Sequence, residues 1–372
     1  MWALLMDLAT LKRGCISFVE LLAVLATVLS LGACGVSSDG SDVRPSRIQI
    51  PNDWGINEGV ELSQISAQWL SEPEFDNVTD VLLVEQDRVV VAEEGNELVR
   101  YYDGAEWSTL AALGVGPGEL MEVDGLSLQP GQFTIFGVAS DQRSMVFDTD
   151  GQLLGSYDVP RMFPRGVGFQ EGIVTVMFTE GPDFLLTRYP DYTDVPNNGV
   201  FEPISLLNFK TSPTDHNTAI SIGARLFLAA NDRQIVVSNA IINYLARFES
   251  NGRLQSLVFF EDELYREVDF RGVSLTEGHI ITGGIAISAN DYVFISRRGI
   301  DPNGFSRIDV VDPDNQLLAP LLVRHHPTSI SVFGGWLLST DGSELYLFDL
   351  PAELSTLLQA GDSARKAFGE TE

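Results

Sequence analysis

The sequence predicts an all-β protein, a six-bladed β-propeller of four-stranded blades followed by a short C-terminal helix. Two observations support this fold class. From residue 46 onwards, short apolar runs alternate with turns that are rich in Gly, Asp, Asn and Pro. One element also recurs about six times: a bulky apolar residue, then an acidic or turn residue, then a second apolar run. A repeat of roughly 40–50 residues is typical of one propeller blade.

The spacing of this recurring element sets the number of blades. Its apolar residue stands at Tyr102, Phe147, Tyr189, Phe248, Val311 and Phe348. Successive positions are 45, 42, 59, 63 and 37 residues apart. Three of these intervals fit a blade, and the two longer ones predict insertions at residues 200–217 and 261–278.

Individual strands can be predicted in several units. In the second unit they are Gly125–Leu128, Phe133–Gly137, Ser144–Phe147 and Leu153–Asp158. The fourth unit has one run too many: Thr218–Ile222, Leu226–Ala229, Gln234–Val237, Tyr244–Phe248 and Leu254–Phe260. The last unit supplies only Thr328–Phe333, Trp336–Ser339 and Glu344–Asp349 before a helical stretch at Ala352–Phe368. Because a propeller must close its ring, we expect a strand within Arg47–Leu70 to complete the last blade.

The N-terminal residues have the pattern of a secretory signal. Lys12 and Arg13 precede an apolar run over residues 16–31, which ends in Leu31-Gly32-Ala33-Cys34. This ending resembles the cleavage motif of bacterial lipoproteins, and the resemblance implies cleavage before Cys34 and acylation of that cysteine. The alternative, an uncleaved transmembrane helix, is disfavoured because the run is short and contains Glu20.

The predicted organisation is therefore a lipoprotein signal peptide at 1–33, a flexible tether at 34–45 and a propeller domain at 46–372. The expected location is the cell envelope, with the lipid-anchored domain facing the periplasm or the cell exterior. The membrane would be a partner through Cys34.

Composition excludes several classes of function. The 372 residues carry a net charge of −29, which argues against nucleic acid as a partner. Cys15 and Cys34 are the only cysteines, and both lie before the predicted domain. That domain therefore has neither a disulfide nor a thiolate with which to bind a metal.

Two segments resemble a known family. Gly114-Val-Gly-Pro-Gly-Glu119 and Val146-Phe-Asp-Thr-Asp-Gly-Gln-Leu153 are similar to segments of the NHL-type propellers found in bacterial lipoproteins, within the wider NHL/TolB-like superfamily. The resemblance implies a disc with a central channel. It also implies a binding scaffold in most cases and a hydrolase or lyase in some.

Common catalytic motifs are absent from the sequence, including Gly-x-Ser-x-Gly, His-Glu-x-x-His and the phosphate-binding Gly-x-x-x-x-Gly-Lys. The acidic turn at Asp148-Thr-Asp150-Gly has alternating carboxylates, but no complete calcium loop follows it. Asp and Gly are also the residues that a hairpin turn favours. Likewise, the glycines at 114–118 are interpreted as a tight loop between blades. We predict neither a cofactor nor a metal from these segments.

The scarce cationic residues provide the candidate site. Those that precede first strands of the predicted blades are Arg161, Arg165, His216, His279, Arg324 and His325, with His326 beside the last. Segments leading into first strands meet at one mouth of a propeller channel. Arg and His there would suit a carboxylate, a phosphate or an acidic sugar. Alternatively, three histidines could hold a divalent metal that activates water, or these residues could simply be polar loop residues.

The predicted function is a membrane-anchored, extracytoplasmic module that binds a small molecule or an envelope protein. The alternative is a metal-dependent propeller hydrolase or lyase with its site at the channel mouth.

Overall fold

The computed structural model describes residues 46–49, 59–67, 70, 74–95, 98–138, 142–159, 166–169, 172–178, 184–189, 226–239, 243–261, 282–297 and 304–359. They belong to one compact unit, Val43–Glu372. The predicted signal peptide, the tether and Cys34 lie outside the described residues. Within the described part of the chain, no helix has the length and apolar character needed to span a membrane.

The described strands form six sheets, numbered here by their first strands along the ring. Sheet 1 contains β4 (Val78–Glu85), β5 (Arg88–Glu93), β6 (Val99–Tyr102), β7 (Trp107–Leu113) and β8 (Glu119–Leu120). Sheet 2 contains β9 (Glu122–Gln129), β10 (Gln132–Val138), β11 (Gln142–Asp148) and β12 (Leu153–Val159). The four strands of sheet 2 match those predicted for the second repeat unit.

The next two sheets border the longest undescribed stretch of the domain. Sheet 3 contains β13 (Gly166–Phe169), β14 (Gly172–Phe178) and β15 (Phe184–Tyr189). Sheet 4 contains β16 (Leu226–Ala230), β17 (Gln234–Asn239), β18 (Tyr244–Glu249), β19 (Leu254–Glu261) and, at its outer edge, β1 (Ser46–Gln49). Among the described residues, the first strand of sheet 4 is β16; the predicted start of this unit at residues 218–222 lies outside the described residues.

The last two sheets lie towards the C-terminus. Sheet 5 contains β20 (Thr282–Ile287), β21 (Val293–Arg297), β22 (Ser306–Val311), β23 (Leu321–Val323) and, at its outer edge, β2 (Val60–Glu61). Sheet 6 contains β24 (Ser329–Phe333), β25 (Trp336–Thr340), β26 (Leu345–Asp349) and β3 (Gln64–Ile65). A helix at residues 352–359 follows, as predicted for the described part of residues 352–368.

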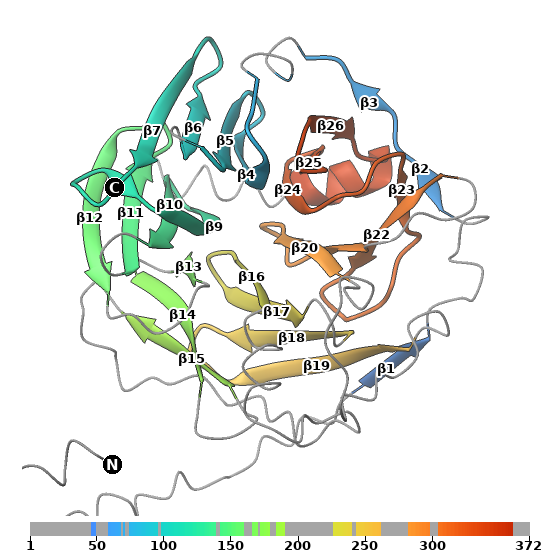
Figure 1. Ribbon diagram of the computed structural model, residues 1–372. Helices are drawn as coiled ribbons and strands as arrows, with labels where there is room; N and C mark the ends of the chain where they lie inside the picture. The colour runs from blue at the N-terminus through green and yellow to red at the C-terminus, as the bar shows by residue number, and fades with distance from the viewer. Residues whose placement is uncertain are drawn as a thin grey trace, which may run out of the picture. The chain divides into compact units, whose positions relative to one another are not determined.

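The first strands of neighbouring sheets contact one another around a closed ring. The contacts join β4 to β9, β9 to β13, β13 to β16, β16 to β20, β20 to β24 and β24 back to β4. Figure 1 shows the sheets radiating from a common centre. This arrangement confirms the predicted all-β propeller.

The predicted number of four-stranded blades requires a correction. Five sheets reach four or five strands, whereas sheet 3 has three strands among the described residues. The structure therefore shows five complete four-stranded blades, not six. Four strands were predicted for every blade, and the described part of sheet 3 lacks the fourth. Residues 190–225, which follow β15, lie outside the described ranges.

An N-terminal strand completes the last sheet, as the sequence predicted. β3 pairs antiparallel with β26, with Gln64 opposite Phe348 and Ile65 opposite Leu347. The outermost strand of sheet 6 thus comes from the N-terminal part of the domain, while its other three strands come from the C-terminal part. This pairing ties the two ends of the domain into one sheet.

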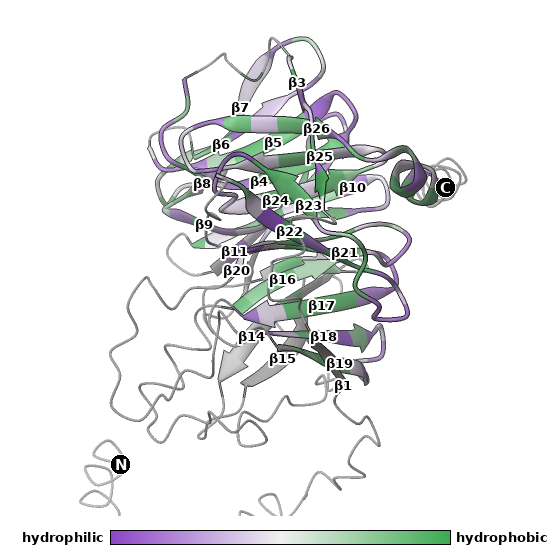
Figure 2. Ribbon diagram, turned by 90° about the vertical axis from the view of Figure 1, so that its right-hand side faces the viewer, coloured by the Kyte–Doolittle hydropathy of each residue, from purple (hydrophilic) through white to green (hydrophobic). Residues whose placement is uncertain are grey.

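The apolar core lies between neighbouring sheets. Side chains along a strand alternate between its two faces, so each sheet supplies apolar residues to two neighbours. Figure 2 shows the strands mostly apolar and many of the connecting turns polar. Separate buried clusters join sheets 1 and 2, sheets 1 and 6, sheets 4 and 5, and sheets 5 and 6. The last cluster includes Leu354 and Leu358 of the C-terminal helix.

The recurring acidic turns join one sheet to the next. The Tyr101 hydroxyl of sheet 1 donates to the Thr149 carbonyl in the turn of sheet 2, at 2.6 Å. Within that turn, Asp148 accepts hydrogen bonds from the amides of Asp150 and Gln152. The Asp148 carboxylate therefore stabilises a hairpin, in agreement with the turn interpretation.

A second acidic turn has the same role between sheets 4 and 5. Arg247 of sheet 4 donates to the carbonyls of Asp291 and Asp312 and to the side chain of Asn315, at 2.8–2.9 Å. Its side chain is buried, and burial lowers its pKa to about 10. The recurrence seen in the sequence thus marks contacts between blades.

The glycine-rich segment at 114–118 is a tight loop, as predicted, but it joins β7 to β8 within sheet 1 rather than one sheet to the next. The Gly116 amide donates to the Glu119 carboxylate at 2.8 Å. Arg143 of sheet 2 donates to the carbonyls of Gly116 and Glu119, at 2.6 and 3.1 Å. These bonds fix the loop against the neighbouring sheet.

Candidate functional site

A cavity of about 390 Å³ lies where the first strands converge. Five of these strands line it: β4, β9, β16, β20 and β24. Its volume falls within the range of small-molecule sites. The cavity is therefore the candidate site, and it occupies the position of the predicted central channel.

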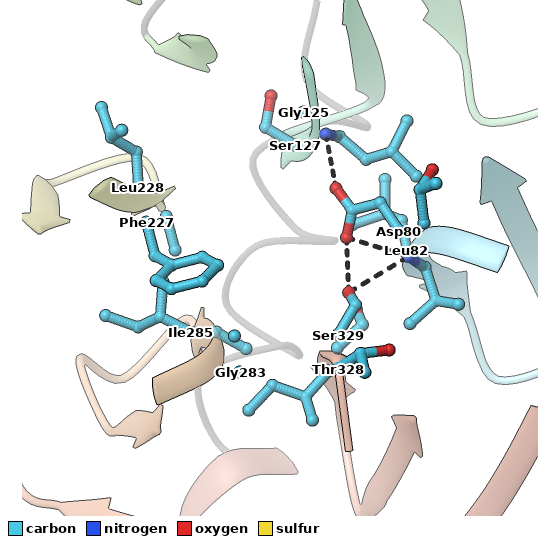
Figure 3. A pocket seen from close by; sticks show the side chains of 18 of the residues that line it. Asp80, Leu82, Gly125, Ser127, Phe227, Leu228, Gly283, Ile285, Thr328 and Ser329 are labelled. Carbon is cyan, nitrogen blue, oxygen red and sulfur yellow. Dashed lines mark hydrogen bonds between the residues drawn. The ribbon is translucent and has the colours of Figure 1, made fainter. Parts of the chain in front are cut away.

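Asp80 is the hub of the polar side of the cavity (Figure 3). One carboxylate oxygen accepts hydrogen bonds from the Ser329 hydroxyl at 2.5 Å and from the Val81 amide at 2.9 Å. The other oxygen accepts from the Leu126 amide at 3.1 Å. One side chain on β4 therefore joins β24 on one side to β9 on the other. These three donors are neutral groups.

Serine hydroxyls continue this pattern along the first strands. The Ser329 and Ser331 hydroxyls on β24 accept hydrogen bonds from the amides of Val81 and Leu83 on β4, at 3.3 and 2.9 Å. The Ser127 hydroxyl on β9 accepts from the Gly168 amide on β13 at 2.7 Å. Inner strands have a free backbone edge, and these side chains satisfy amides along it.

The opposite side of the cavity is apolar. Figure 3 shows Phe227 and Leu228 of β16 and Ile285 of β20 across from Asp80 and Ser329. Phe227 also packs against the buried cluster between sheets 4 and 5. The wall from sheets 4 and 5 is therefore apolar, whereas the wall from sheets 1, 2 and 6, called here the polar wall, carries polar groups among apolar residues.

The charge of the described lining is negative. Asp80, Asp124 and Asp341 line the cavity, and the described lining includes no Lys, Arg or His. Burial opposes ionisation of Asp341, but hydrogen bonds from Ser343, Tyr346 and Glu344 outweigh it and lower the pKa of the carboxyl. Asp341 is therefore a stable anion near neutral pH.

His325, one of the predicted site residues, lies in the core of sheet 6. Its ring stacks on Tyr346, with centroids 3.9 Å apart, and a 2.7 Å hydrogen bond joins its Nε2 to the Ser339 hydroxyl. Burial lowers the pKa of His325 to about 4, with repulsion from His326 acting in the same direction. The side chain is therefore neutral at physiological pH and takes no part in the described cavity lining.

Arg324 lies on the surface beside it. Its guanidinium forms a 2.8 Å ion pair with Glu61 and lies 4.3 Å from the ring centroid of Phe305. Arg324 and His325 are neighbours in the sequence, but their side chains do not form a common site, because Arg324 is exposed and His325 is buried. Neither residue belongs to the described lining of the central cavity.

The remaining predicted site residues, Arg161, Arg165, His216 and His279, lie outside the described residues. His216 stands ten residues before β16, the first described strand of sheet 4, and the run at 218–222 that it was predicted to precede also lies outside the described residues. Within the described ranges, no group of three or more His, Cys, Asp or Glu side chains is placed to hold a metal ion. The predicted site of three histidines needs His216 or His279, and both lie outside those ranges.

The sequence analysis missed Asp80 and the inner-strand serines. A signal was present, since Asp80, Ser127 and Ser329 each interrupt or begin an apolar run. Polar residues within such runs were not distinguished from ordinary sheet residues. Their role depends on which strands become neighbours in the ring, and local pattern does not specify that.

Comparison with known proteins supports the fold class. No protein-family model matches the chain, and no curated protein matches it. A solved structure from Bacteroides fragilis, assigned as an exported protein, is 10% identical, with a TM-score of 0.51, and the match covers 82% of this chain and 99% of that one.

Two enzymes have solved structures with weaker similarity. A gluconolactonase from Xanthomonas campestris is 14% identical, with a TM-score of 0.46, over 83% of this chain and 99% of that one. A streptogramin B lyase is 15% identical, with a TM-score of 0.43, over 73% and 78%. Likeness at these identities concerns the fold alone. Any functional argument therefore has to come from the chain's own cavity.

Proposed function

We propose that this protein is a binding module whose central cavity takes a small amphiphilic ligand, either uncharged or cationic. The division of the cavity into an apolar and a polar wall carries this proposal. Phe227, Leu228 and Ile285 would cover an apolar group of the ligand. The opposite wall offers the hydroxyls of Thr328 and Ser329 beside the Asp80 carboxylate.

The charge of the lining favours this ligand class over the anion expected from the sequence. A carboxylate or phosphate would be brought close to Asp80, Asp124 and Asp341 in a partly enclosed space. Repulsion between like charges is stronger there than in bulk water. A cation or a neutral polyol avoids that repulsion, and an alkyl group gains from the apolar wall.

We further propose that the domain works outside the cytoplasm, anchored to a membrane through Cys34. The Leu-Gly-Ala-Cys motif supports the anchor, and the similarity to an exported protein supports the location. Phase partition in a cloud-point detergent tests it. We expect the wild-type protein to be cleaved and to enter the detergent phase, and Cys34→Ala either to enter the aqueous phase or to remain uncleaved; equal partition of the two proteins after cleavage to the same length contradicts the anchor.

A thermal-shift series with three ligands of matched alkyl length tests the cavity. The purified full chain is heated with hexyltrimethylammonium, hexyl glucoside or heptanoate. We expect one or both of the first two to raise the melting temperature in a saturable manner, and heptanoate to have no such effect.

Leu228→Arg provides the matched variant, because it places a cation on the apolar wall of the cavity. The variant is expected to lose the response to hexyltrimethylammonium. Leu357→Arg, on the exposed face of the C-terminal helix, controls for the added charge and should respond like wild type. A response to heptanoate alone in the wild-type chain contradicts the proposed ligand class.

A further inference from the structure

Three sheets carry an added strand on their outer edge. β8 pairs parallel with β7 of sheet 1, β1 pairs parallel with β19 of sheet 4, and β2 pairs parallel with β23 of sheet 5. In the last two cases the added strand comes from the N-terminal segment of the chain, far away in sequence. The outer edges of these blades therefore accept extended segments.

The added strands occupy matching positions. The pairs Leu245–Val258 and Ile308–Leu321 each lie three residues before the apolar residue of the recurring turn, Phe248 or Val311. β1 begins opposite Val258, and β2 begins opposite Leu321. In sheet 1, where the matching residue is Ala111, β8 begins one residue later.

In sheet 2, no added strand among the described residues pairs with the outer strand at the matching position. Its matching pair is Ser144–Tyr157, three residues before Phe147. The described part of sheet 2 ends at β12, whose outer edge continues through Asp158 and Val159. A β-bulge in the pairing of β11 with β12 precedes this stretch. The pairing of β18 with β19 in sheet 4 has a β-bulge at the matching place, and β1 pairs with the part of β19 that follows it.

Side-chain exposure distinguishes sheet 2 in the same way. At the matching position, Ala111, Val258 and Leu321 are at most 1% exposed, whereas Tyr157 is 36% exposed. Leu153 and Leu154, earlier on the same strand, are 50% and 58% exposed. An exposed strand edge with apolar side chains is a template for pairing with another chain.

We propose that the outer edge of β12 is a docking site for an extended segment of another protein, which adds as a fifth strand parallel to β12. Backbone hydrogen bonds along the edge would supply the pairing, and Leu153 and Leu154 would supply apolar contacts. The net charge of −29 favours a segment with basic residues. The chain's own β1, Ser-Arg-Ile-Gln, has this composition. This site is separate from the ligand cavity and does not depend on it.

A peptide with the sequence of residues 44–50, Arg-Pro-Ser-Arg-Ile-Gln-Ile, is the probe. The purified full chain is incubated with the labelled peptide, and binding is followed by fluorescence anisotropy. Hydrogen exchange read by mass spectrometry locates the bound peptide. We expect saturable binding and about tenfold slower exchange in the C-terminal half of β12. A peptide with Ile48→Pro should not bind, because proline cannot pair along a strand edge.

Matched variants separate docking from unfolding. Leu153→Ser combined with Leu154→Ser should weaken binding by at least about tenfold, since the double variant removes both apolar contacts without changing the charge. Gln255→Ser changes the residue of β19 that matches Leu154 in register and is also exposed, and it should leave binding unchanged.

Three results overturn the proposal. The first is the absence of binding by the wild-type chain. The second is protection confined to β19, which shows that the peptide displaces β1. The third is a concentration-dependent dimer of the chain alone that the Leu153 and Leu154 substitutions abolish, because the occupant of the edge is then a second copy.

Discussion

The carboxylate of Asp80 accepts a 2.5 Å hydrogen bond from the hydroxyl of Ser329, a residue 249 positions later in the chain. The bond crosses from β4 to β24, where the first and last sheets of the ring meet. The same carboxylate accepts from the Leu126 amide of sheet 2. Asp80 therefore stabilises ring closure and also forms part of the polar wall of the cavity.

Removal of Asp80 should destabilise the fold. Asp80→Ala is expected to cost about 3 kcal/mol in the free energy of unfolding, because the Leu126 amide and the Ser329 hydroxyl lose their acceptor and the Val81 amide keeps only its 3.3 Å bond to Ser329. Ser329→Ala should cost about 1 kcal/mol, and the double variant less than the sum, with a coupling energy of about 1 kcal/mol. Urea denaturation measures all three. Glu74→Ala, at an exposed loop position, is the control; strictly additive costs contradict the proposed bridge.

The buried histidine makes stability depend on pH. Because the pKa of His325 falls from 6.5 in the unfolded chain to about 4 in the folded one, the unfolded state binds the proton more readily. The contribution of neutral His325 to the free energy of unfolding is complete above about pH 6.5. It is lost as the pH falls towards 4, by about 3 kcal/mol at most.

The variant that tests this replaces both partners, His325→Phe with Ser339→Ala, so that no buried hydroxyl loses its hydrogen bond. Its unfolding free energy should fall less steeply than that of wild type between pH 6.5 and 4. Carboxylates that titrate in this range act in both proteins and cancel in the comparison. If the unfolding free energies of the two proteins change with pH in parallel, His325 is not the source of the pH dependence.

The buried guanidinium of Arg247 should be essential to the contact between sheets 4 and 5. Arg247→Met leaves the Asp291 and Asp312 carbonyls without this donor, at an expected cost of about 3 kcal/mol. Arg253→Met, at an exposed position in the same sheet, should change stability by less than about 0.5 kcal/mol. Thermal and urea denaturation measure the stability of both variants. If Arg247→Met lowers stability as little as Arg253→Met, Arg247 does not anchor sheet 4 to sheet 5.

Two glycines with nearly the same backbone conformation should respond differently to alanine. Gly151 and Gly118 have φ values of 79° and 76°, so alanine is strained at both, by about 1 kcal/mol. At Gly151 a Cβ would also lie 2.7 Å from the buried ring of Tyr101, whereas at Gly118 no atom lies within 4 Å. Gly151→Ala should therefore be about 2 kcal/mol more destabilising than Gly118→Ala. Equal losses of stability contradict the close turn–ring contact.

Much of the fold could be predicted because its signals are local. Alternating apolar runs and Asp-Gly turns specify hairpins, so β9 to β12 agree with their predicted positions. Closure of the last sheet by β3 could also be predicted, because three runs cannot make a four-stranded blade. The added strands β1 and β2 were not anticipated, since two to four residues paired to a distant edge leave no periodic pattern.

The site was less predictable for a physical reason. Arginine and histidine beside a strand suggested an anion-binding rim, but the sequence alone does not say whether such a side chain faces solvent, core or channel. His325 is a core residue stacked on Tyr346, and Arg324 pairs with Glu61. Asp80 acquires its role only when residues 249 positions apart become neighbours.

The central claim is that the cavity between the inner strands binds a small amphiphile. A crystal structure of the full chain soaked with hexyltrimethylammonium tests it most directly. We expect the alkyl chain against Phe227 and Ile285 and the ammonium group on the side of Asp80 and Ser329. An empty cavity in crystals soaked above the concentration that saturates the thermal shift, or the same ammonium bound only elsewhere, contradicts the claim.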